Sequence, residues 1–271
     1  MKKSVVLLAA TSMLLSAPTW AHRTWIKPDT TVVSKEDSWV AFDAAISNEI
    51  FGFDHHAMRL DRVKAIAPNG EQIPLQHTHT GKYRSVFDLQ LSQQGTYKVA
   101  FNSESLRASW TNPEGEKKYW PGRGEIGSLS EFEKQVPKDA ANLIVSNVYN
   151  RVETFVTAGA PTNTVLEETG KGVELVPITH PNDLYAGEQA QFKIHLNGQP
   201  AIGAEVEVIP AGMRYRDQQN EITTRSDSEG VISITWPHAG QYFMEVRYSD
   251  MQGEYPAEKR QAGYSAVFEV L

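Results

Sequence analysis

Histidine is the residue type in this chain whose number and spacing could best do chemistry. The sequence has 271 residues, with eight histidines and no cysteine. Four of the histidines form two close pairs, His55 with His56 and His77 with His79. Imidazole nitrogens bind nickel, copper and zinc, and a chain without thiols must build any metal site from nitrogen and oxygen ligands. The pairs predict a transition-metal site; the alternative is two loops that carry solvated histidines.

Each pair is spaced so that both of its rings could reach one ion. Gly52 and Asp54 indicate a loop just before the first pair, and on a loop both imidazoles can turn towards a metal. Asp54 could then be a further ligand or could orient an imidazole by accepting its hydrogen bond. If His77 and His79 end a strand, the period of two places both rings on one face.

A fifth histidine, His22, follows a segment typical of a secretory signal. Two lysines near the start precede an apolar run over 5–17, and small residues lead to Ala21. The run is too short to span a bilayer as a helix. We therefore expect residues 1–21 to be removed as a signal peptide. His22 would then begin the mature chain and could chelate a metal through its α-amino group and ring Nδ1, which titrate near neutral pH.

The three remaining histidines are weaker candidates. His180 lies before a proline, His195 alternates with apolar residues in a predicted strand, and His238 lies in a turn. Isolated histidines in such places are usually hydrogen-bonded or exposed rather than ligands. We expect no metal at these positions.

Charge and hydropathy limit the classes of partner. The formal net charge is −7, and the predicted signal contributes only lysines to it, so the mature chain is more acidic still. Nucleic-acid binding is disfavoured because phosphate contacts dominate that affinity. No segment after the signal is long and apolar enough to enter a membrane. We expect a soluble exported protein whose natural destination is the periplasm.

Short β-rich runs separated by turn residues dominate the rest of the chain. Runs at 25–28, 38–44, 63–67 and 95–101 are rich in β-branched and aromatic residues, and a Pro-Asn-Gly turn stands at 68–70. Amphipathic periodicity of helix length is almost absent. The pattern predicts an all-β protein.

An internal repeat divides the chain into two halves. The stretches 86–97 and 231–242 share, without a gap, a strand, a polar turn and Gly-x-Tyr. A tyrosine in this position commonly ties the corner of a sandwich through its hydroxyl. After the signal we expect two tandem immunoglobulin-like β-sandwich domains, over 22–158 and 173–271, joined by a small polar linker at 159–172.

Residues 102–142 interrupt the strand pattern. This stretch is rich in glycine and proline, and we expect a loop-rich insertion in the first sandwich. One short helix is predicted over 129–136, capped by Ser128 or Ser130 and stopped by Pro137.

Aromatic and basic residues are concentrated in the same insertion. Trp110, Tyr119 and Trp120 accompany Lys117, Lys118 and Arg123. Such a group could stack on a sugar, pack over a metal or dock a partner protein. Equally, the aromatic rings could pin the insertion to the sandwich. We carry Trp110, Tyr119 and Trp120 forward as a candidate surface platform.

Known catalytic motifs are missing from the sequence. It contains no Gly-x-Ser-x-Gly elbow, no phosphate-binding loop, no His-Glu-x-x-His and no dinucleotide fingerprint. The carboxylate pairs at 131 and 133 and at 167 and 168 fit a helix surface and the linker. We therefore expect no enzymatic activity.

Several short stretches, mainly turns and strands, together resemble a known family. They are Ala21-His22, 25–28, 42–44, 47–48, Phe51, Asp54 and 68–70 in the first half, and 172–177, Gly187, 196–200 and 224–230 in the second. With these stretches the sequence resembles, over essentially the whole predicted mature chain, a bacterial secreted family usually described as the periplasmic component of cobalt/nickel uptake systems. The resemblance implies periplasmic handling of a metal and a membrane transporter or receptor as partner.

Three functions follow from these observations. The first is a non-enzymatic metal-binding protein for nickel, cobalt, copper or zinc, with His22 and members of the two histidine pairs as ligands. The second is a copper-dependent polysaccharide oxidase, by analogy with proteins that use a terminal histidine brace on a β-sandwich. The third is a structural or adhesive tandem sandwich with incidental histidines.

Overall fold

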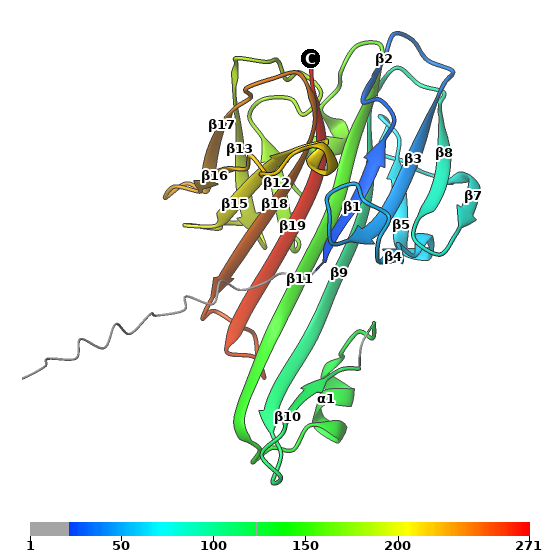
Figure 1. Cartoon of the computed structure of the whole chain (residues 1–271). Coiled ribbons are helices and arrows are strands. Elements are labelled where there is room, and N and C mark those ends of the chain that lie inside the picture. The colour runs from blue at the N-terminus through cyan, green and yellow to red at the C-terminus, as the bar shows by residue number, and fades with distance from the viewer. Residues whose placement is uncertain (1–21, 123) are drawn as a thin grey trace, which may run out of the picture.

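The computed structural model describes residues 22–122 and 124–271, and β-strands are the dominant regular structure in this part of the chain. Figure 1 shows a body of packed sheets from which the longest strands run on into a separate arm. None of the helices in these ranges is long and apolar enough to cross a bilayer. The all-β prediction is confirmed, whereas the predicted signal peptide at 1–21 lies outside the described residues.

A ten-stranded sheet runs through the whole molecule and is shared by its two halves. Its order is β16-β15-β18-β19-β11-β9-β5-β6, with β10 beside β9 and β2 beside β11. Neighbouring strands are antiparallel except at β11–β19 and β11–β2, which are parallel. The bounds are β2 Val32–Val33, β5 Val63–Ile66, β6 Gln72–Ile73, β9 Gly95–Thr111, β10 Lys117–Trp120, β11 Ala141–Ala158, β15 Glu205–Pro210, β16 Ile222–Arg225, β18 Gly240–Asp250 and β19 Lys259–Val270.

Two smaller sheets pack against this shared sheet. The first has five strands: β1 Arg23–Pro28, β3 Ser38–Ser47, β4 His56–Ala57, β7 Gln76–Thr80 and β8 Ser85–Leu91. The second has four: β12 Val173–Pro177, β13 Gln189–Leu196, β14 Gln199–Pro200 and β17 Val231–Thr235. Three 3₁₀ turns complete the body, at Leu60–Arg62, Thr164–Leu166 and Met213–Tyr215.

The two small sheets cover opposite faces of the shared sheet. On β11, Val152 belongs to the apolar core beneath the first small sheet, while Tyr149 belongs to the core beneath the second. Successive side chains of a strand point to opposite faces of the sheet. Tyr149 and Val152 are an odd number of residues apart, so their side chains point to opposite faces. Each half of the shared sheet is therefore covered on one face and largely bare on the other.

The strand order repeats when it is read from either end of the shared sheet. β16 and β6 occupy the edges, followed by β15 and β5, then β18 and β9, with β19 and β11 at the centre. The small sheets correspond in the same way, since β1-β3-β8 matches β12-β13-β17. The internal repeat thus extends over the whole of both halves. An approximate two-fold axis that runs along the strands relates one half to the other.

Both halves carry the tyrosine corner that the repeated sequence predicts. The hydroxyl of Tyr97 donates to the carbonyl of Gln93 at 2.9 Å and accepts from its backbone N–H at 2.7 Å. Tyr242 makes the same two bonds to His238, at 2.8 and 3.3 Å. These corners are a hallmark of immunoglobulin-like sandwiches. The prediction of immunoglobulin-like sandwiches is confirmed.

The two halves are joined along the centre of the sheet. β11 and β19 pair in parallel from Ser146 with Lys259 to Thr154 with Val267. A small apolar core at the seam takes side chains from both halves, among them Trp25 and Phe243. The boundary expected at 159–172 therefore separates two cores but not two sheets. That segment also buries Val165 in its 3₁₀ turn, so it packs on the body.

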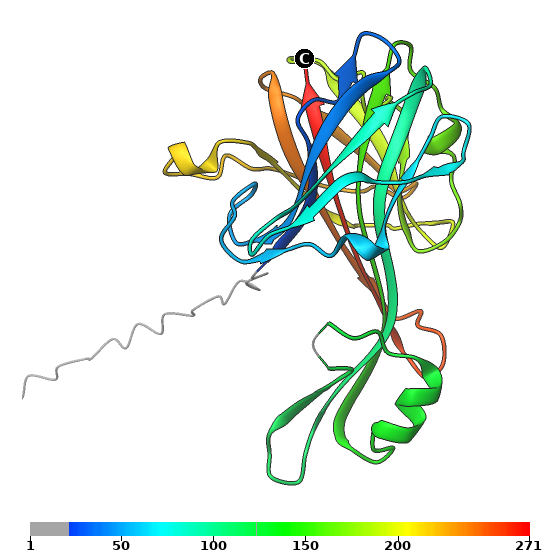
Figure 2. The ribbon, with the colours of Figure 1, turned by 90° about the vertical axis from the view of Figure 1, so that its right-hand side faces the viewer.

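The arm is built from the outer parts of β9 and β11, β10, and α1 (Leu129–Gln135) (Figure 2). Its own small core includes Trp120 and Phe132, whose rings meet edge to face at 5.7 Å. The predicted short helix is confirmed. Paired strands extend into both ends of the predicted insertion, since β9 runs on to Thr111 and β11 starts at Ala141, and irregular segments join these strands to β10 and α1.

Candidate metal centre

Strand register brings three of the predicted histidines to one place. β1 begins beside the end of β3, with Arg23 opposite Ser47. β4 pairs with the other side of β3, with His56 opposite Ile46. His22 therefore lies next to one flank of the end of β3, and His55 and His56 reach the other.

The ring of His55 contacts the rings of both His22 and His56. The His22 and His55 rings are stacked, with 3.7 Å between centroids and 19° between planes. The His55 and His56 rings meet edge to face at 4.2 Å. Stacked rings do not point their nitrogens at a common point. Accordingly, within 22–122 and 124–271 no three His, Cys, Asp or Glu side chains are arranged to hold a metal ion.

An aromatic cluster fixes the loop that carries His55 and His56. Trp25 is fully buried and meets Phe51 edge to face at 5.4 Å, and its centroid lies 5.8 Å from that of Phe53. Its indole N–H donates to Ser47 Oγ at 2.8 Å, and Ser47 Oγ donates to the carbonyl of Glu49 at 2.5 Å. The loop is thus tied to β1, the strand that His22 precedes.

Asp54 closes the same loop. Its Oδ1 accepts the backbone N–H of Asn48 at 2.9 Å, and the side chain is exposed. The sequence raised Asp54 as a ligand or as an acceptor for an imidazole, and the contact shown is with the backbone. Asp54 directly precedes His55 in the sequence. Its second carboxylate oxygen is chemically able to bind a metal or to accept a hydrogen bond from an imidazole.

Arg23 anchors the start of β1 to the bare face of the shared sheet. Its guanidinium contacts Glu207 at 3.1 Å and Glu245 at 3.8 Å. These two glutamates are direct cross-strand partners on β15 and β18. Burial raises the pKa of Glu245, although Arg247 and Arg23 act against this rise. Sequence analysis missed Arg23, whose only signal was its place beside His22.

His77 and His79 lie elsewhere. Both are on β7, at the opposite edge of the five-stranded sheet from β1. His77 has a left-handed backbone (φ 48°), and the register with β8 shifts between Gln76 and His79. The simple period of two therefore does not apply. His79 nevertheless pairs with Val86 and the His77 ring contacts Asp88, and these two β8 residues lie on one face of the strand. The His77 ring stacks on Trp39 at 5.3 Å, and its Nδ1 lies 2.8 Å from Asp88.

The candidate platform residues belong to the arm. Trp120 is 7% exposed and donates its indole N–H to Gln135 at 3.1 Å, and Trp110 packs against the same core. Tyr119 is the member that faces solvent, at 68% exposure. Because β10 carries Trp120 into a core, the three residues do not form one exposed surface. Trp110 and Trp120 pack within the arm, so they do not pin the insertion to the sandwich, which was the alternative from the sequence.

The other histidines have structural partners, as expected. His180 Nδ1 accepts the backbone N–H of Asn182 at 3.1 Å, and its Nε2 lies 3.1 Å from Thr96 Oγ1. His195 Nδ1 lies 2.7 Å from Glu168, and the backbone of His238 holds a tyrosine corner.

Comparison with known proteins identifies a family. No curated protein matches the chain. Among solved structures, the D0-D1 domain of intimin is 12% identical over 92% of this chain and 99% of its own, with a TM-score of 0.25. The human OSCAR ligand-binding domain is 11% identical over 91% and 97%, with a TM-score of 0.21. Residues 19–250 match the model of a family described as a domain of unknown function, DUF4198, and the chain belongs to that family.

Proposed function

We propose that this protein binds a divalent transition metal through His22 together with His55 or His56. The observation that supports the proposal is the 3.7 Å ring contact between His22 and His55, which come from different segments of the first half. Three imidazoles at one site form a donor set suited to nickel, copper or zinc, and cobalt binds similar ligands. The stability of the fold does not by itself require three histidines to meet at the end of one strand.

Metal binding requires the three rings to turn. Rotation about the side-chain torsions of His22 and His55 would exchange the stack for nitrogens that point at one ion. His22 gains a second ligand if the mature chain starts there, because its α-amino group is then free to close a chelate with Nδ1. Asp54 would orient one imidazole or complete the coordination. The proposed site is thus assembled fully only after the leader is removed.

The resemblance noted from the sequence extends this proposal to transport. We propose that the protein is exported to the periplasm, where it carries nickel or cobalt to a membrane transporter or receptor. No catalytic step is part of the proposal. Copper binds most imidazole sites more tightly than nickel or cobalt, so affinity in solution does not identify the biological metal.

Titration of metal-free protein purified after export tests the proposal. Intact mass first establishes whether the chain begins at His22. Nickel, cobalt, copper and zinc are then titrated separately by calorimetry. We expect one tight equivalent, weakened at least tenfold by the double substitution of His55 and His56 to Ala. One extra residue in front of His22 should weaken it similarly, because the α-amino group is displaced.

The matched control is the double substitution of His77 and His79 to Ala. This control also removes two imidazoles, but from β7, at the edge of the five-stranded sheet away from His22. Metal binding should therefore not change. Equal loss in both double variants would overturn the assignment to His22, His55 and His56. Absence of any stoichiometric metal from the wild-type protein would overturn the function itself.

A further inference from the structure

A second candidate site lies on the other side of the molecule, where the second small sheet ends and the bare face of β9 and β11 begins. The corner holds a half-open cavity of about 490 Å³, a volume within the range of sites for small molecules. Its floor is formed by β9 and β11, and its wall by the segment at 169–173. None of these residues belongs to the His22 cluster.

The floor of this cavity contains a buried carboxylate with one unpaired oxygen. Glu153 is 2% exposed, and its Oε1 accepts the hydroxyl of Tyr264 at 2.9 Å. Its Oε2 has no hydrogen-bond partner among the described residues. Leaving a buried acceptor unpaired is costly, and a charged one more so, which makes such atoms rare in folded proteins. Glu153 Oε2 is therefore an acceptor that lacks a donor.

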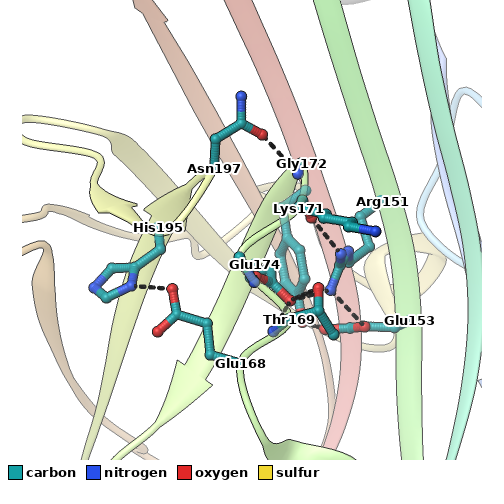
Figure 3. Close-up of polar contacts among 11 residues, drawn as sticks. Arg151, Glu153, Glu168, Thr169, Lys171, Gly172, Glu174, His195 and Asn197 are labelled. Carbon is teal, nitrogen blue, oxygen red and sulfur yellow. Dashed lines mark hydrogen bonds and ion pairs between the residues drawn. The ribbon is translucent and has the colours of Figure 1, made fainter.

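The nearest cation is already committed to other partners. Arg151 Nη1 lies 3.9 Å from Glu153 Oε2, but it contacts Glu174 at 3.1 Å. Its Nη2 donates to the carbonyl of Lys171 at 2.9 Å. Figure 3 shows Arg151 held between the 169–172 segment and β11 in this way. Arg151 thus neutralises the region without supplying the missing hydrogen bond.

The wall of the cavity is held rigidly in place. Glu174 accepts the backbone N–H and the hydroxyl of Thr169, at 3.1 and 2.7 Å, and the N–H of Gly170 at 2.8 Å. Burial alone would raise the pKa of Glu174, but these hydrogen bonds and Arg151 hold its pKa below the ordinary value. Glu174 therefore stays ionised and keeps the segment pinned against the sheet.

Room and positive charge lie beside the unpaired oxygen. Ala100 is the cross-strand partner of Glu153 and offers only a methyl group. Lys98 and Asn102 flank Ala100 on the same face of β9, because they are two residues away on either side. Lys171 adds a second ammonium group from the wall. A ligand above Ala100 would therefore meet an acceptor that needs a donor, with an ammonium group next to it.

We propose that this corner binds a small carboxylate that carries a hydroxyl or ammonium group on the adjacent carbon. The donor would satisfy Glu153 Oε2, while the carboxylate would pair with Lys98 and Lys171. Hydroxy acids and amino acids share this chemistry. The site does not depend on the metal-binding function, since it uses none of the same residues.

Ligand-observed NMR and calorimetry on the full chain test this proposal with defined probes. L-Malate represents the hydroxy acids and L-serine the amino acids. Succinate lacks the adjacent donor, and glycerol lacks the carboxylate. We expect malate or serine to bind at least tenfold more tightly than succinate and glycerol. Whichever of the two binds more tightly identifies the class of ligand.

Two substitutions locate the binding. Ala100→Leu fills the space above Glu153 and should abolish ligand binding. Ala41→Leu, at an exposed position of β3 in the first small sheet, should leave ligand binding unchanged. Lys98→Met removes the charge without filling the cavity and should weaken binding at least tenfold, so the test survives a folding defect in Ala100→Leu. Binding of none of the four probes, or binding that both cavity variants leave unchanged, would overturn the proposal.

Discussion

At the scale of single residues, Arg23 links the candidate metal centre to the shared sheet. Its guanidinium lies between Glu207 and Glu245, which face each other across neighbouring strands. Like charges in such direct pairs repel, and Glu245 is mostly buried. Arg23 therefore offsets a repulsion that the sheet itself creates.

Replacing Arg23 with Ala should lower the free energy of unfolding by about 1–3 kcal/mol, because a charged hydrogen bond to Glu207 is lost and Arg247 alone then faces the two glutamates. Urea denaturation at neutral pH measures the change. The double variant Arg23→Ala with Glu207→Gln should recover part of it. A single variant as stable as wild type would show that solvent already screens the pair.

His180 makes the stability of the fold depend on pH. Burial lowers the pKa of this ring in the folded chain, whereas the unfolded ring titrates at about 6.5. Below that pH the unfolded chain binds more protons, so the stability due to neutral His180 is lost as pH falls towards the folded pKa. The stability difference between wild type and His180→Gln should shrink from pH 7 to pH 5 in urea titrations. A difference that is constant with pH would contradict this.

Residue types were easier to predict than residue contacts. The sequence indicated His22, His55 and His56 as candidates, but only the pairing of β1 and β4 with opposite sides of β3 brings them together. The same information placed His77 and His79 in the candidate set, although they lie on β7, at the far edge of the sheet from β1. The left-handed backbone of His77 and the register shift beside it break the regular alternation that the sequence suggested. Strand register depends on distant pairing, which local sequence does not contain.

At the scale of elements, the arm folds on a core of its own. Trp120, Phe132 and Val145 come from β10, α1 and β11, and they pack on the inner face of the outer β9 strand. The glycines and prolines of 102–142 predicted loops, and they lie in the irregular segments that join these elements. Alternation along β9 was hidden by its polar residues, since both faces of the strand are partly exposed there.

Replacing Trp120 with Ala should unfold the arm while the body stays intact. The cost of about 3–5 kcal/mol for such a buried aromatic exceeds what a core this small can lose. Hydrogen–deuterium exchange should rise over 103–147 and around Ala257, which packs in the same core, and stay unchanged over 173–246. Tyr119→Ala, at the neighbouring exposed position, is the control and should leave exchange unaltered. Uniform loss of protection would show that arm and body unfold together.

At the scale of the whole molecule, the two sandwiches depend on each other. The turn and strand patterns predicted two immunoglobulin-like halves, and the matching tyrosine corners confirm the repeat behind that prediction. The parallel pairing of β11 with β19 could not be predicted, because no turn joins these strands and nothing local marks them as neighbours. Parallel strands that meet across such a distance are specified only by the complete fold.

The full chain should therefore unfold in one cooperative transition. The fragment 173–271 alone should fail to give a dispersed NMR spectrum, since it leaves the edge of β19 unpaired and exposes Phe243 and Val267. Scanning calorimetry of the whole protein tests the same point. Two resolved transitions, or a well-folded fragment, would mean that the seam contributes little to stability.

The position of β19 also bears on how the molecule is made. It follows every other strand along the described chain, yet it lies at the middle of the ten-stranded sheet. Until Lys259–Val270 have been synthesised, the second sandwich lacks one of its central strands and β11 lacks its parallel partner. Pairing between strands so far apart in sequence is slow, so the edge of β11 stays open while the second half is being made. A ribosome that stops short leaves two open sheet edges, and such a product is marked for aggregation or degradation rather than use.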